Sequence, residues 1–535
     1  MTGPVSRCRD EGHLPLLTGL GLLPPVSSDS APIADALAEL EQVRRGVPIA
    51  SGLLAIWSGW RQIAPARQRD RASRTESWLR SVTDSGGTFT IGLPETSPDR
   101  FSQFCGDRVL FWTAGLPASP LAAIVSSRIG RSEAARSAFA TKLKHVTERI
   151  QEAGQTIVTA EGSAGSDLVI RSAHRTQTPL LTIHCSEKGQ PKDWLSRLMR
   201  AELTQRPQTS ELFISPSLDE SPDSPEATSE PLRDRAAIAI ADSVWTLTLR
   251  KNGNQHRLLQ QRLAKPDPDA SAIRLVLMAD ETLPPHISEL VDQGAIPWRL
   301  IDQAVDVSGY DGTKQNSQSQ LSKNSRVNSG ELQHLAAELN CQDQWLIHWT
   351  RQSTHPHGGQ TSDEWLDHQL DSSSNRATGP LATLEHILRD RVLRASPAAI
   401  RGSRPMTCFS AVPLRDLIAR RQFRAHRGRW DFEPYGLCIR RRCLESLGAR
   451  PVIYGDDSLW QSLPEPERPW FQQRFSGDSD TGIDWSQELE WRIAGDVTLT
   501  DIGRNDLVVF CRQKKEAAHL APLCAWPVLA LTDFV

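Results

Sequence analysis

The sequence predicts an α/β unit built on a parallel sheet, followed by a separate α+β unit. Between residues 105 and 305, short runs of β-branched and apolar residues alternate with helical patterns, which is typical of parallel strands joined by crossover helices. Residues 331–535 contain many short strand-like runs and fewer helical stretches, which favours mostly antiparallel pairing. Residues 306–330 are rich in Ser, Asn, Gln and Gly, a composition typical of an interdomain linker.

The first unit is predicted from individual runs taken in chain order. Residues 1–90 are expected to be helical in part, and the α/β unit itself is expected to span 91–305. Within 131–154, Phe139, Leu143, Val146 and Ile150 fall on one helical face. Strands are predicted at 122–127, 156–160, 180–184, 244–249 and 273–278. A helix is predicted after the Gly/Ser turn 162–167, and further helices near 194–203, 235–241, 258–263 and 287–291. Residues 206–232 are rich in Ser, Pro and acidic residues, so a disordered insertion is expected there.

Composition limits the classes of function. The net charge is −3, from 61 basic and 64 acidic residues, so the overall charge does not favour a nucleic-acid or membrane partner. The nine cysteines form no CxxC pair, which disfavours a disulfide framework or zinc site and favours the cytoplasm. No run of 18 apolar residues occurs, so no membrane span is expected. The apolar run 14–26 follows acidic residues and is interrupted by Gly and Pro, which disfavours a signal peptide.

Two turns of the first unit are candidate phosphate-binding loops. Small residues let backbone N–H groups approach a phosphate, hydroxyls add donors, and an arginine supplies a bidentate fork. Both turns follow predicted strands, whose carboxyl ends are where ligands bind in doubly wound sheets. Ordinary tight βα turns explain the same residues equally well. The candidates are Ser126, Ser127, Arg128, Gly162, Ser163, Gly165, Ser166 and Asp167.

The stretch from 94 to 305 resembles the DNA-processing protein A (DprA/Smf) family, within the SLOG superfamily of Rossmann-like nucleotide binders. The resemblance runs through DRVLFWTAGLP (107–117), AAIVSSR (122–128), AGQTIVTAEGSAGSDLVIRSAH (153–174) and LVDQGAIPW (290–298). It implies a Rossmann-like domain with a nucleotide or single-stranded nucleic-acid phosphate pocket at the two turns. Ser126 and Ser166 replace the family's usual Gly and Ile, which favours nucleotide over DNA. The Pro-Gly-Gly-x-Gly-Thr motif of nucleotide phosphoribohydrolases is absent, which disfavours that hydrolysis.

The second unit has its own pattern of elements and its own resemblance. Strands are predicted at 345–351, 406–412, 435–440, 450–455, 488–495 and 507–511, with helices at 380–393 and 413–421. Three segments, CFSAVPL (408–414), GARPVIY (448–454) and ELEWR (488–492), resemble AbiGi-type domains linked to abortive phage infection. The resemblance covers about 340–520 and implies an effector domain.

Five residues of this unit form a catalytic hypothesis. ADP-ribosyltransferases use an early His or Arg to hold NAD, a middle Ser or Thr, and a late Glu that stabilises an oxocarbenium-like charge. Here His348 or Arg351, Ser410, and Glu488 with Glu490 occur in that order. Positions 488 and 490 share one face if they lie in a strand. The alternative is structural, with Glu490 paired to Arg492 and His348 a satisfied core histidine.

These observations predict a two-part nucleotide- or nucleotide-signal-binding protein with an effector unit, acting in bacterial phage defence or stress response. The expected partner is a nucleotide-derived small molecule, NAD is the candidate cofactor, and neither a metal nor a membrane is expected. A homo-oligomer is left open. The first alternative is a single-stranded DNA-binding protein of recombination or DNA uptake. The second is a purely structural interaction module in the C-terminal part.

Overall fold

The chain divides into two compact units in a computed structural model. Unit 1 comprises Met1–Gly130 and Ala134–Asp306, and unit 2 comprises Val307–Val535 with Arg131–Glu133. The structure describes residues 13–25, 31–92, 98–130, 132–186, 190–202, 208–218, 230–264, 273–300, 334–335, 337–339, 344–353, 356, 360–371, 379–397, 400–419, 421, 423–424, 429–473 and 488–533. The predicted linker 306–330 lies outside the described residues.

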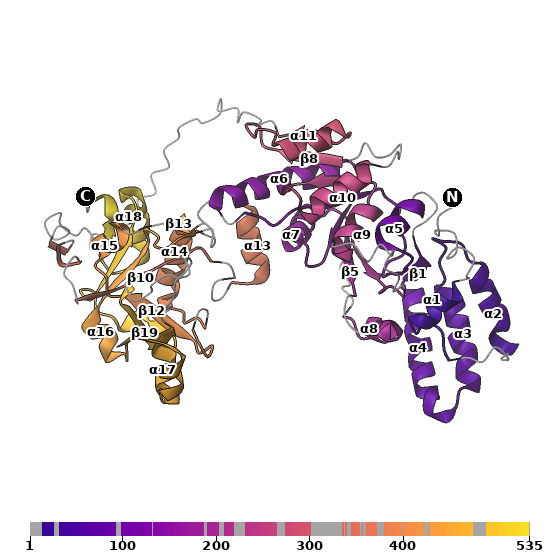
Figure 1. The fold of residues 1–535 in the computed structure, drawn as a ribbon, viewed down its shortest axis with the longest axis horizontal. Helices are drawn as coiled ribbons and strands as arrows, with labels where there is room; N and C mark the ends of the chain where they lie inside the picture. Colours follow the sequence, from indigo (N-terminus) through magenta and orange to yellow (C-terminus); the bar gives the residue numbers. More distant parts are fainter. Residues whose placement is uncertain are drawn as a thin grey trace. The chain divides into compact units, whose positions relative to one another are not determined.

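Unit 1 is built on a nine-stranded sheet with the order β1-β2-β6-β5-β4-β3-β7-β8-β9 (Figure 1). All neighbours from β6 to β9 pair in parallel, whereas β1 and β2 are antiparallel to their neighbours. The parallel α/β class is therefore confirmed. The strands are β1 (Thr88–Ile91), β2 (Val109–Trp112), β3 (Leu121–Val125), β4 (Thr156–Ala160), β5 (Leu180–Cys185), β6 (Thr209–Ile214), β7 (Ser243–Thr246), β8 (Ile273–Leu277) and β9 (Ile296–Arg299).

The strand order reverses at β3, whose neighbours are β4 on one side and β7 on the other. Such a point leaves room for ligands at the carboxyl ends of the strands. The helices are α1 (Leu14–Gly19), α2 (Ala31–Gln42), α3 (Ala50–Ile63), α4 (Ala66–Asp84), α5 (Pro98–Cys105), α6 (Glu133–Glu152), α7 (Ser166–Thr176), α8 (Trp194–Leu198), α9 (Leu232–Ile240), α10 (Asn254–Leu263) and α11 (Pro285–Asp292). The predicted apolar face of α6, from Phe139 to Ile150, is buried.

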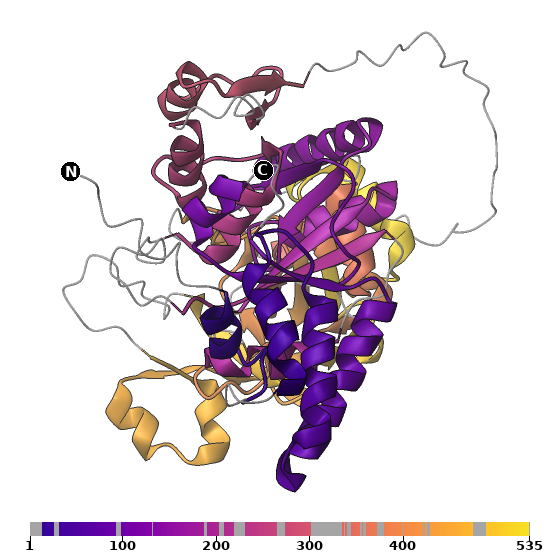
Figure 2. The ribbon, with the colours of Figure 1, turned by 90° about the vertical axis from the view of Figure 1, so that its right-hand side faces the viewer.

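The N-terminal helices share a core with the antiparallel end of the sheet. Leu17 of α1 and Trp57 of α3 are buried together with Phe89 of β1 and Phe111 of β2. The Trp57 indole N–H donates to the carbonyl of Leu22 at 2.8 Å, which satisfies its polar atom inside this core. The helical N-terminal region and the sheet therefore form one folded unit (Figure 2).

One strand lies where the sequence analysis expected a disordered insertion. Residues 209–214 form β6, which pairs with β2 and β5 in the interior of the sheet. Leu212 and Ile214 are buried on one face of the strand, and their core contacts offset the cost of ordering the segment. The Ser/Pro-rich composition of the whole segment concealed this short apolar run, so the expectation of disorder is wrong for residues 209–214.

Buried arginines satisfy the carboxyl end of α9, a helix enclosed by the core. The Arg100 guanidinium donates to the carbonyls of Ala239 and Ala241 at 2.7 and 2.9 Å. The Arg262 guanidinium donates to the carbonyls of Ile238 and Asp242. The last carbonyls of a helix have no partner within the helix, so a buried helix end needs donors from elsewhere.

Unit 2 contains a seven-stranded sheet with the order β16-β19-β12-β10-β15-β21-β22. Its pairs are antiparallel except β21 with β22, as the sequence predicted. The strands are β10 (Trp345–Trp349), β12 (Met406–Ser410), β15 (Gly436–Arg440), β16 (Arg450–Pro451), β19 (Glu490–Ala494), β21 (Leu507–Cys511) and β22 (Val528–Ala530). One apolar core includes Leu346, Phe409 and Trp491, and a second includes Ile347, Cys438 and Phe510.

Smaller elements surround this sheet. The predicted strand 450–455 is two strands, because β16 joins the main sheet whereas β17 (Ile453–Gly455) pairs in parallel with β18 (Phe471–Gln473). A 3₁₀ helix, η5 (Glu465–Trp470), leads into β18. The helices are α13 (Ser362–Leu370), α14 (Pro380–Asp390), α15 (Leu414–Ala419), α16 (Arg441–Ser446), α17 (Asp457–Ser462) and α18 (Lys514–Leu520). In the described residues, no helix is long and apolar enough to cross a membrane.

The capping of α9 generates the first prediction. Arg100→Met removes two donors from buried carbonyls, so we expect unit 1 to lose on the order of 3 kcal/mol of unfolding free energy. Urea unfolding of the full chain measures this loss. Lys144→Met removes an exposed cation from α6 and should change the free energy by less than about 0.5 kcal/mol. Equal effects of the two variants would contradict the capping role.

Candidate functional site

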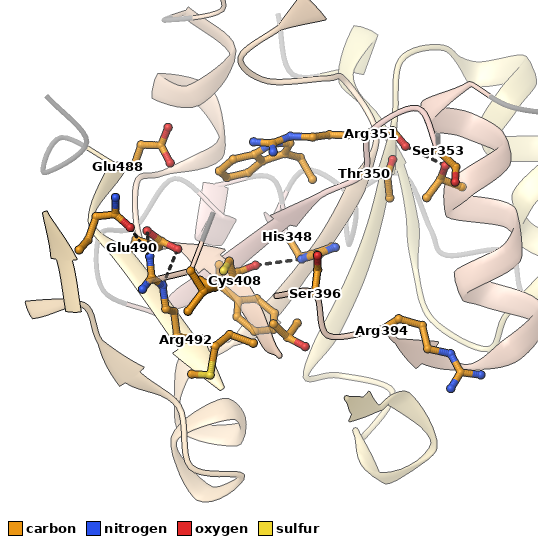
Figure 3. Close-up of a pocket in the computed structure, with 17 residues that line it drawn as sticks. His348, Thr350, Arg351, Ser353, Arg394, Ser396, Cys408, Glu488, Glu490 and Arg492 are labelled. Carbon is orange, nitrogen blue, oxygen red and sulfur yellow. Dashed lines mark hydrogen bonds and ion pairs between the residues drawn. The ribbon is translucent and has the colours of Figure 1, made fainter. Parts of the chain in front are cut away.

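A cavity of about 640 Å³ opens beside the sheet of unit 2 (Figure 3). Its walls come from segments that are far apart in the chain: the end of β10, the start of β12, and the start of β19. Four of the five predicted catalytic residues line it, namely His348, Arg351, Glu488 and Glu490. The fold therefore brings together residues that the sequence separates by about 140 positions.

The cavity lies where β10 and β12 separate. These strands share one register pair, Ile347 opposite Ser410, whereas β10 and β15 share five. Beyond Ile347, the His348 ring reaches the neighbouring strand, and Nδ1 lies 2.9 Å from the carbonyl oxygen of Cys408. The His348 side chain thus bonds to the Cys408 carbonyl in the region where the pairing of β10 with β12 has ended. The two strands can therefore separate without leaving this carbonyl unsatisfied.

The His348 ring is held neutral at ordinary pH. Burial lowers the pKa of His348 and the Arg351 charge lowers it further, against the opposite effect of the Cys408 carbonyl. A bond to a carbonyl requires Nδ1 to carry the proton, so Nε2 of the neutral ring is an acceptor. The ring is also fixed by an edge contact with Phe409, at 5.7 Å between centroids.

Glu490 is paired with Arg492 at the opposite wall. The two side chains form a bidentate ion pair, with Arg492 Nε 2.9 Å from Oε1 and Nη2 3.1 Å from Oε2 of Glu490. Arg492 is buried and donates three further bonds, to the carbonyls of Pro469 and Phe471 and to the side chain of Gln472. All five guanidinium N–H groups are therefore bonded, and the pair fastens β19 to η5 and β18.

Glu488 does not continue the strand that contains Glu490. β19 begins at Glu490, and Leu489 has a left-handed backbone with φ of 45°. The expected strand alternation therefore fails between 488 and 490, although both residues line the cavity. A left-handed leucine is strained, and such residues concentrate at functional sites. Figure 3 shows the Glu488 carboxylate apart from the bonded Glu490–Arg492 pair.

Arg351 continues the wall beyond β10. Its guanidinium lies over the Trp349 ring at 5.7 Å from the centroid. The hydroxyl of the adjacent Thr350 donates to the carbonyls of Pro380 and Tyr435. Stacking on an indole fixes the plane of the guanidinium, which favours recognition of planar or bidentate anions. Arg394 lines the same cavity and pairs with Asp496 at 3.1 Å.

Ser410 lies outside the cavity lining. Its hydroxyl donates to the carbonyl of Glu488 at 2.6 Å and accepts from the backbone N–H of Val412, and the residue is fully buried. It therefore holds the Glu488 backbone. Burial, together with the Glu490 charge, raises the pKa of the neighbouring Cys408 thiol to about 12, so Cys408 is not a thiolate nucleophile.

Sequence reasoning named Arg492 only as a structural partner and missed the lining residues Arg394, Ser396 and Gln472. Arg394 and Ser396 come from the segment after α14, and Gln472 comes from β18. The Glu-Trp-Arg order within ELEWR places a cation two positions after a carboxylate on one strand face, a spacing that signals a pair. We find no comparable signal for the other three.

The predicted phosphate-binding residues of unit 1 lie at adjacent strand ends. Ser126–Arg128 follow β3 and Gly162–Asp167 follow β4, and these strands are parallel neighbours. The Ser126 hydroxyl lies 2.6 Å from that of Thr248, and the Ser127 hydroxyl accepts from the backbone N–H of Arg250 at 3.1 Å. Both hydroxyls therefore hold the loop after β7, while the Arg128 side chain is exposed.

The second turn leads directly into α7. Gly165 caps this helix with φ of 81°, and an added Cβ would lie 2.7 Å from the Phe139 ring, so only glycine fits there. Ser166 is buried at the first helical position, and Gly162 and Ser163 form the turn before it. Asp167 lies exposed in the first turn, where its charge stabilises the helix.

No group of three or more His, Cys, Asp or Glu side chains in the described ranges is placed to hold a metal ion. The lining of the unit 2 cavity contains guanidinium, imidazole, hydroxyl and carboxylate groups.

Comparison with known proteins finds a distant similarity to a solved structure. No protein-family model matches the sequence, and no curated protein matches it. Among solved structures, the chain is similar to DNA processing protein A (DprA) from Streptococcus pneumoniae, with a TM-score of 0.27 and 14% sequence identity. The match covers 54% of this chain and 93% of that chain. A similarity of this size assigns neither fold nor activity, and the resemblance to AbiGi-type domains stays a prediction.

The Glu490–Arg492 pair generates a stability prediction. Glu490→Gln leaves a buried guanidinium without its counter-charge, so we expect unit 2 to lose about 3 kcal/mol of unfolding free energy. Chemical denaturation of the full chain measures it. Glu465→Gln, which neutralises an exposed glutamate of η5, is the control and should lose less than about 0.5 kcal/mol. An unchanged midpoint for Glu490→Gln would show that the pair does not hold the wall.

His348 generates a pH prediction. Because the folded-state pKa lies below the unfolded value of about 6.5, the unfolded chain binds more protons as the pH falls. The stability of unit 2 is therefore fully present above about pH 6.5 and declines toward the folded-state pKa. His348→Gln should make this decline shallower in unfolding measurements between about pH 7.5 and 5. The same slope in both proteins would contradict a depressed pKa.

Proposed function

We propose that unit 2 is a catalytic unit that acts on a nucleotide-class ligand, with NAD as the first candidate, and that unit 1 binds a nucleotide. One observation carries the catalytic part: a single cavity gathers His348, Arg351, Glu488 and Glu490 from distant segments. Its volume of about 640 Å³ lies within the range of small-molecule and cofactor sites.

The charges in the cavity favour a ligand that carries both phosphate and a developing positive charge. Arg351 and Arg394 are cations on the wall, Arg394 in an ion pair with Asp496, and Arg492 is paired with Glu490. Figure 3 shows Glu488 on the side of the cavity away from Arg394 and Ser396. NAD carries a pyrophosphate for the guanidinium groups and a ribose whose C1′ becomes cationic when nicotinamide leaves.

The proposed step breaks the C1′–N bond between ribose and nicotinamide. The bonding electron pair leaves with the nicotinamide nitrogen, and an oxygen of water or of an acceptor hydroxyl forms the new bond to C1′. The Glu488 carboxylate stabilises the positive charge on the ribose, and Nε2 of His348 accepts the proton that the attacking oxygen loses. Arg351 orients the phosphates. Glu490 acts through Arg492 by holding the wall.

For unit 1, we propose nucleotide binding at the carboxyl ends of β3 and β4. Arg128 and the first turn of α7 are the groups that would meet a phosphate, since Ser126 and Ser127 are bonded to the β7 loop. Ligand binding by unit 1 would then control the output of unit 2. This division suits a role in phage defence or stress response, in which a nucleotide signal releases an effector activity.

The activity is tested by incubating the purified full chain with NAD and measuring nicotinamide release. We expect turnover, and we expect Glu488→Gln to lower it at least 100-fold because the developing charge loses its carboxylate. Glu465→Gln is the matched control and should retain full turnover. Unchanged turnover in Glu488→Gln would contradict the catalytic role of Glu488. A wild-type chain that releases no nicotinamide even when nucleotide is bound to unit 1 would contradict the proposed activity.

Single-stranded DNA binding is the alternative outcome of a binding experiment. A DNA-processing protein should bind longer strands more tightly and lose affinity steeply as salt rises, because each phosphate contact releases counterions. A nucleotide-binding unit should bind mononucleotides with little dependence on strand length. Steep salt and length dependence would replace the nucleotide proposal with the DNA one.

A further inference from the structure

Unit 1 contains a cavity at the carboxyl ends of β7 and β8, smaller than the one in unit 2. Its volume is about 140 Å³. It lies next to the reversal of strand order at β3, where sheets of this class bind ligands. It is separate from the eight residues predicted to bind phosphate. Lys142, Thr246, Leu249, Leu277, Glu281 and Ile287 are among the residues that line it.

A buried ion pair lies on the wall of this cavity. Lys142 reaches it from α6, with its side chain 6% exposed, and its ammonium lies 2.7 Å from Oε2 of Glu281 and 3.3 Å from the carbonyl of Leu247. Glu281 Oε2 also accepts from the backbone N–H of Met278 at 2.9 Å. An ammonium has three donors, so one remains for a ligand, and Oε1 of Glu281 remains as an acceptor.

Thr246 adds an unsatisfied group to the same wall. The residue is 2% exposed, and its hydroxyl has no hydrogen-bond partner among the residues that the structure describes. An unpaired buried hydroxyl costs about 1–3 kcal/mol, so such groups are normally bonded to protein, water or ligand. The cavity thus presents a donor, an acceptor and a hydroxyl, and the aliphatic residues Leu249, Leu277 and Ile287 line it as well.

The cavity is joined to the predicted phosphate loop through the residues after β7. The backbone N–H of Ser127 donates to the carbonyl of Thr248 at 2.9 Å, and the Ser127 hydroxyl accepts from the N–H of Arg250. Thr248 lines the cavity, and Arg128 follows Ser127 directly. A ligand could therefore place one end in the cavity and a phosphate near Arg128.

We propose that this cavity binds the lactam edge of a guanine-type base, an inference that rests on nucleotide binding by unit 1. The exocyclic oxygen of guanine accepts a hydrogen bond and its neighbouring ring N–H donates one. The ammonium of Lys142 and the carboxylate of Glu281 offer the complementary order at adjacent atoms. Adenine presents a donor amino group beside an acceptor ring nitrogen. In the same position its amino group would face the Lys142 ammonium, also a donor, and its ring nitrogen would face the Glu281 carboxylate, also an acceptor. The apolar side chains cover the faces of the flat ring.

The test compares guanosine 5′-monophosphate with adenosine 5′-monophosphate by calorimetry on the full chain. We expect guanosine monophosphate to bind at least tenfold more tightly, because adenine leaves buried groups unpaired. Lys142→Met and Glu281→Gln should each abolish the preference. Lys144→Met, on the exposed face of the same helix, should preserve it. Glu281 is partly exposed, so its variant tests the inference even if Lys142→Met fails to fold.

Two outcomes separate this inference from the function on which it rests. In the first outcome, both nucleotides bind equally, Arg128→Ala weakens the binding of both, and Glu281→Gln weakens the binding of neither. Unit 1 then binds nucleotides, but the proposed base site is overturned. If neither nucleotide binds, the proposed function of unit 1 and the base site are both overturned.

Discussion

The cavity of unit 2 depends on the hydrogen bonds and the ion pair of one buried guanidinium, that of Arg492. A charge in this position is costly unless every donor is bonded and a counter-charge is in contact. Arg492 meets both conditions through Glu490 and three acceptors from η5 and β18. The small β17–β18 sheet is therefore fixed against β19, and Gln472 is fixed with it. One wall of the cavity exists because this charge is satisfied.

The facing wall arises from an interruption of the sheet. Since β10 and β12 share one register pair, their backbones separate beyond Ile347, and His348 reaches across to the carbonyl of Cys408. The same bond sets the tautomer of the ring and leaves Nε2 as an acceptor. The bond between His348 and the Cys408 carbonyl thus accompanies the separation of β10 from β12 and also leaves Nε2 of His348 as a hydrogen-bond acceptor. The left-handed Leu489 separates Glu488 from the paired Glu490, so one carboxylate is bonded to Arg492 while the other lines the cavity from outside the strand.

The sequence was sufficient where a local pattern determines the structure. β4 and β21 coincide with their predicted bounds because each is an apolar run enclosed by polar or glycine-containing turns. The sequence analysis did not predict β6, because its six residues lie within a Ser/Pro-rich segment whose average composition indicates disorder. The order of His348, Arg351 and the glutamates named four residues that the fold brings to one cavity, and their catalytic role stays a prediction. The spacing of Glu490 and Arg492 also indicated their pairing, as the structural alternative, and the structure contains that pair. The burial of the pair could not be predicted, since the other acceptors of Arg492 lie about 20 residues away in the chain.

We propose that the unit 2 cavity holds a nucleotide-class ligand between Arg351 and Glu488. A crystal structure of the full chain soaked with ADP-ribose, the product of the proposed cleavage, would show where the ligand lies. We expect ligand density in the cavity, with phosphate oxygens within hydrogen-bond distance of the Arg351 guanidinium and the ribose beside the Glu488 carboxylate. An empty cavity at saturating ligand, or phosphates placed against the glutamates, would contradict it.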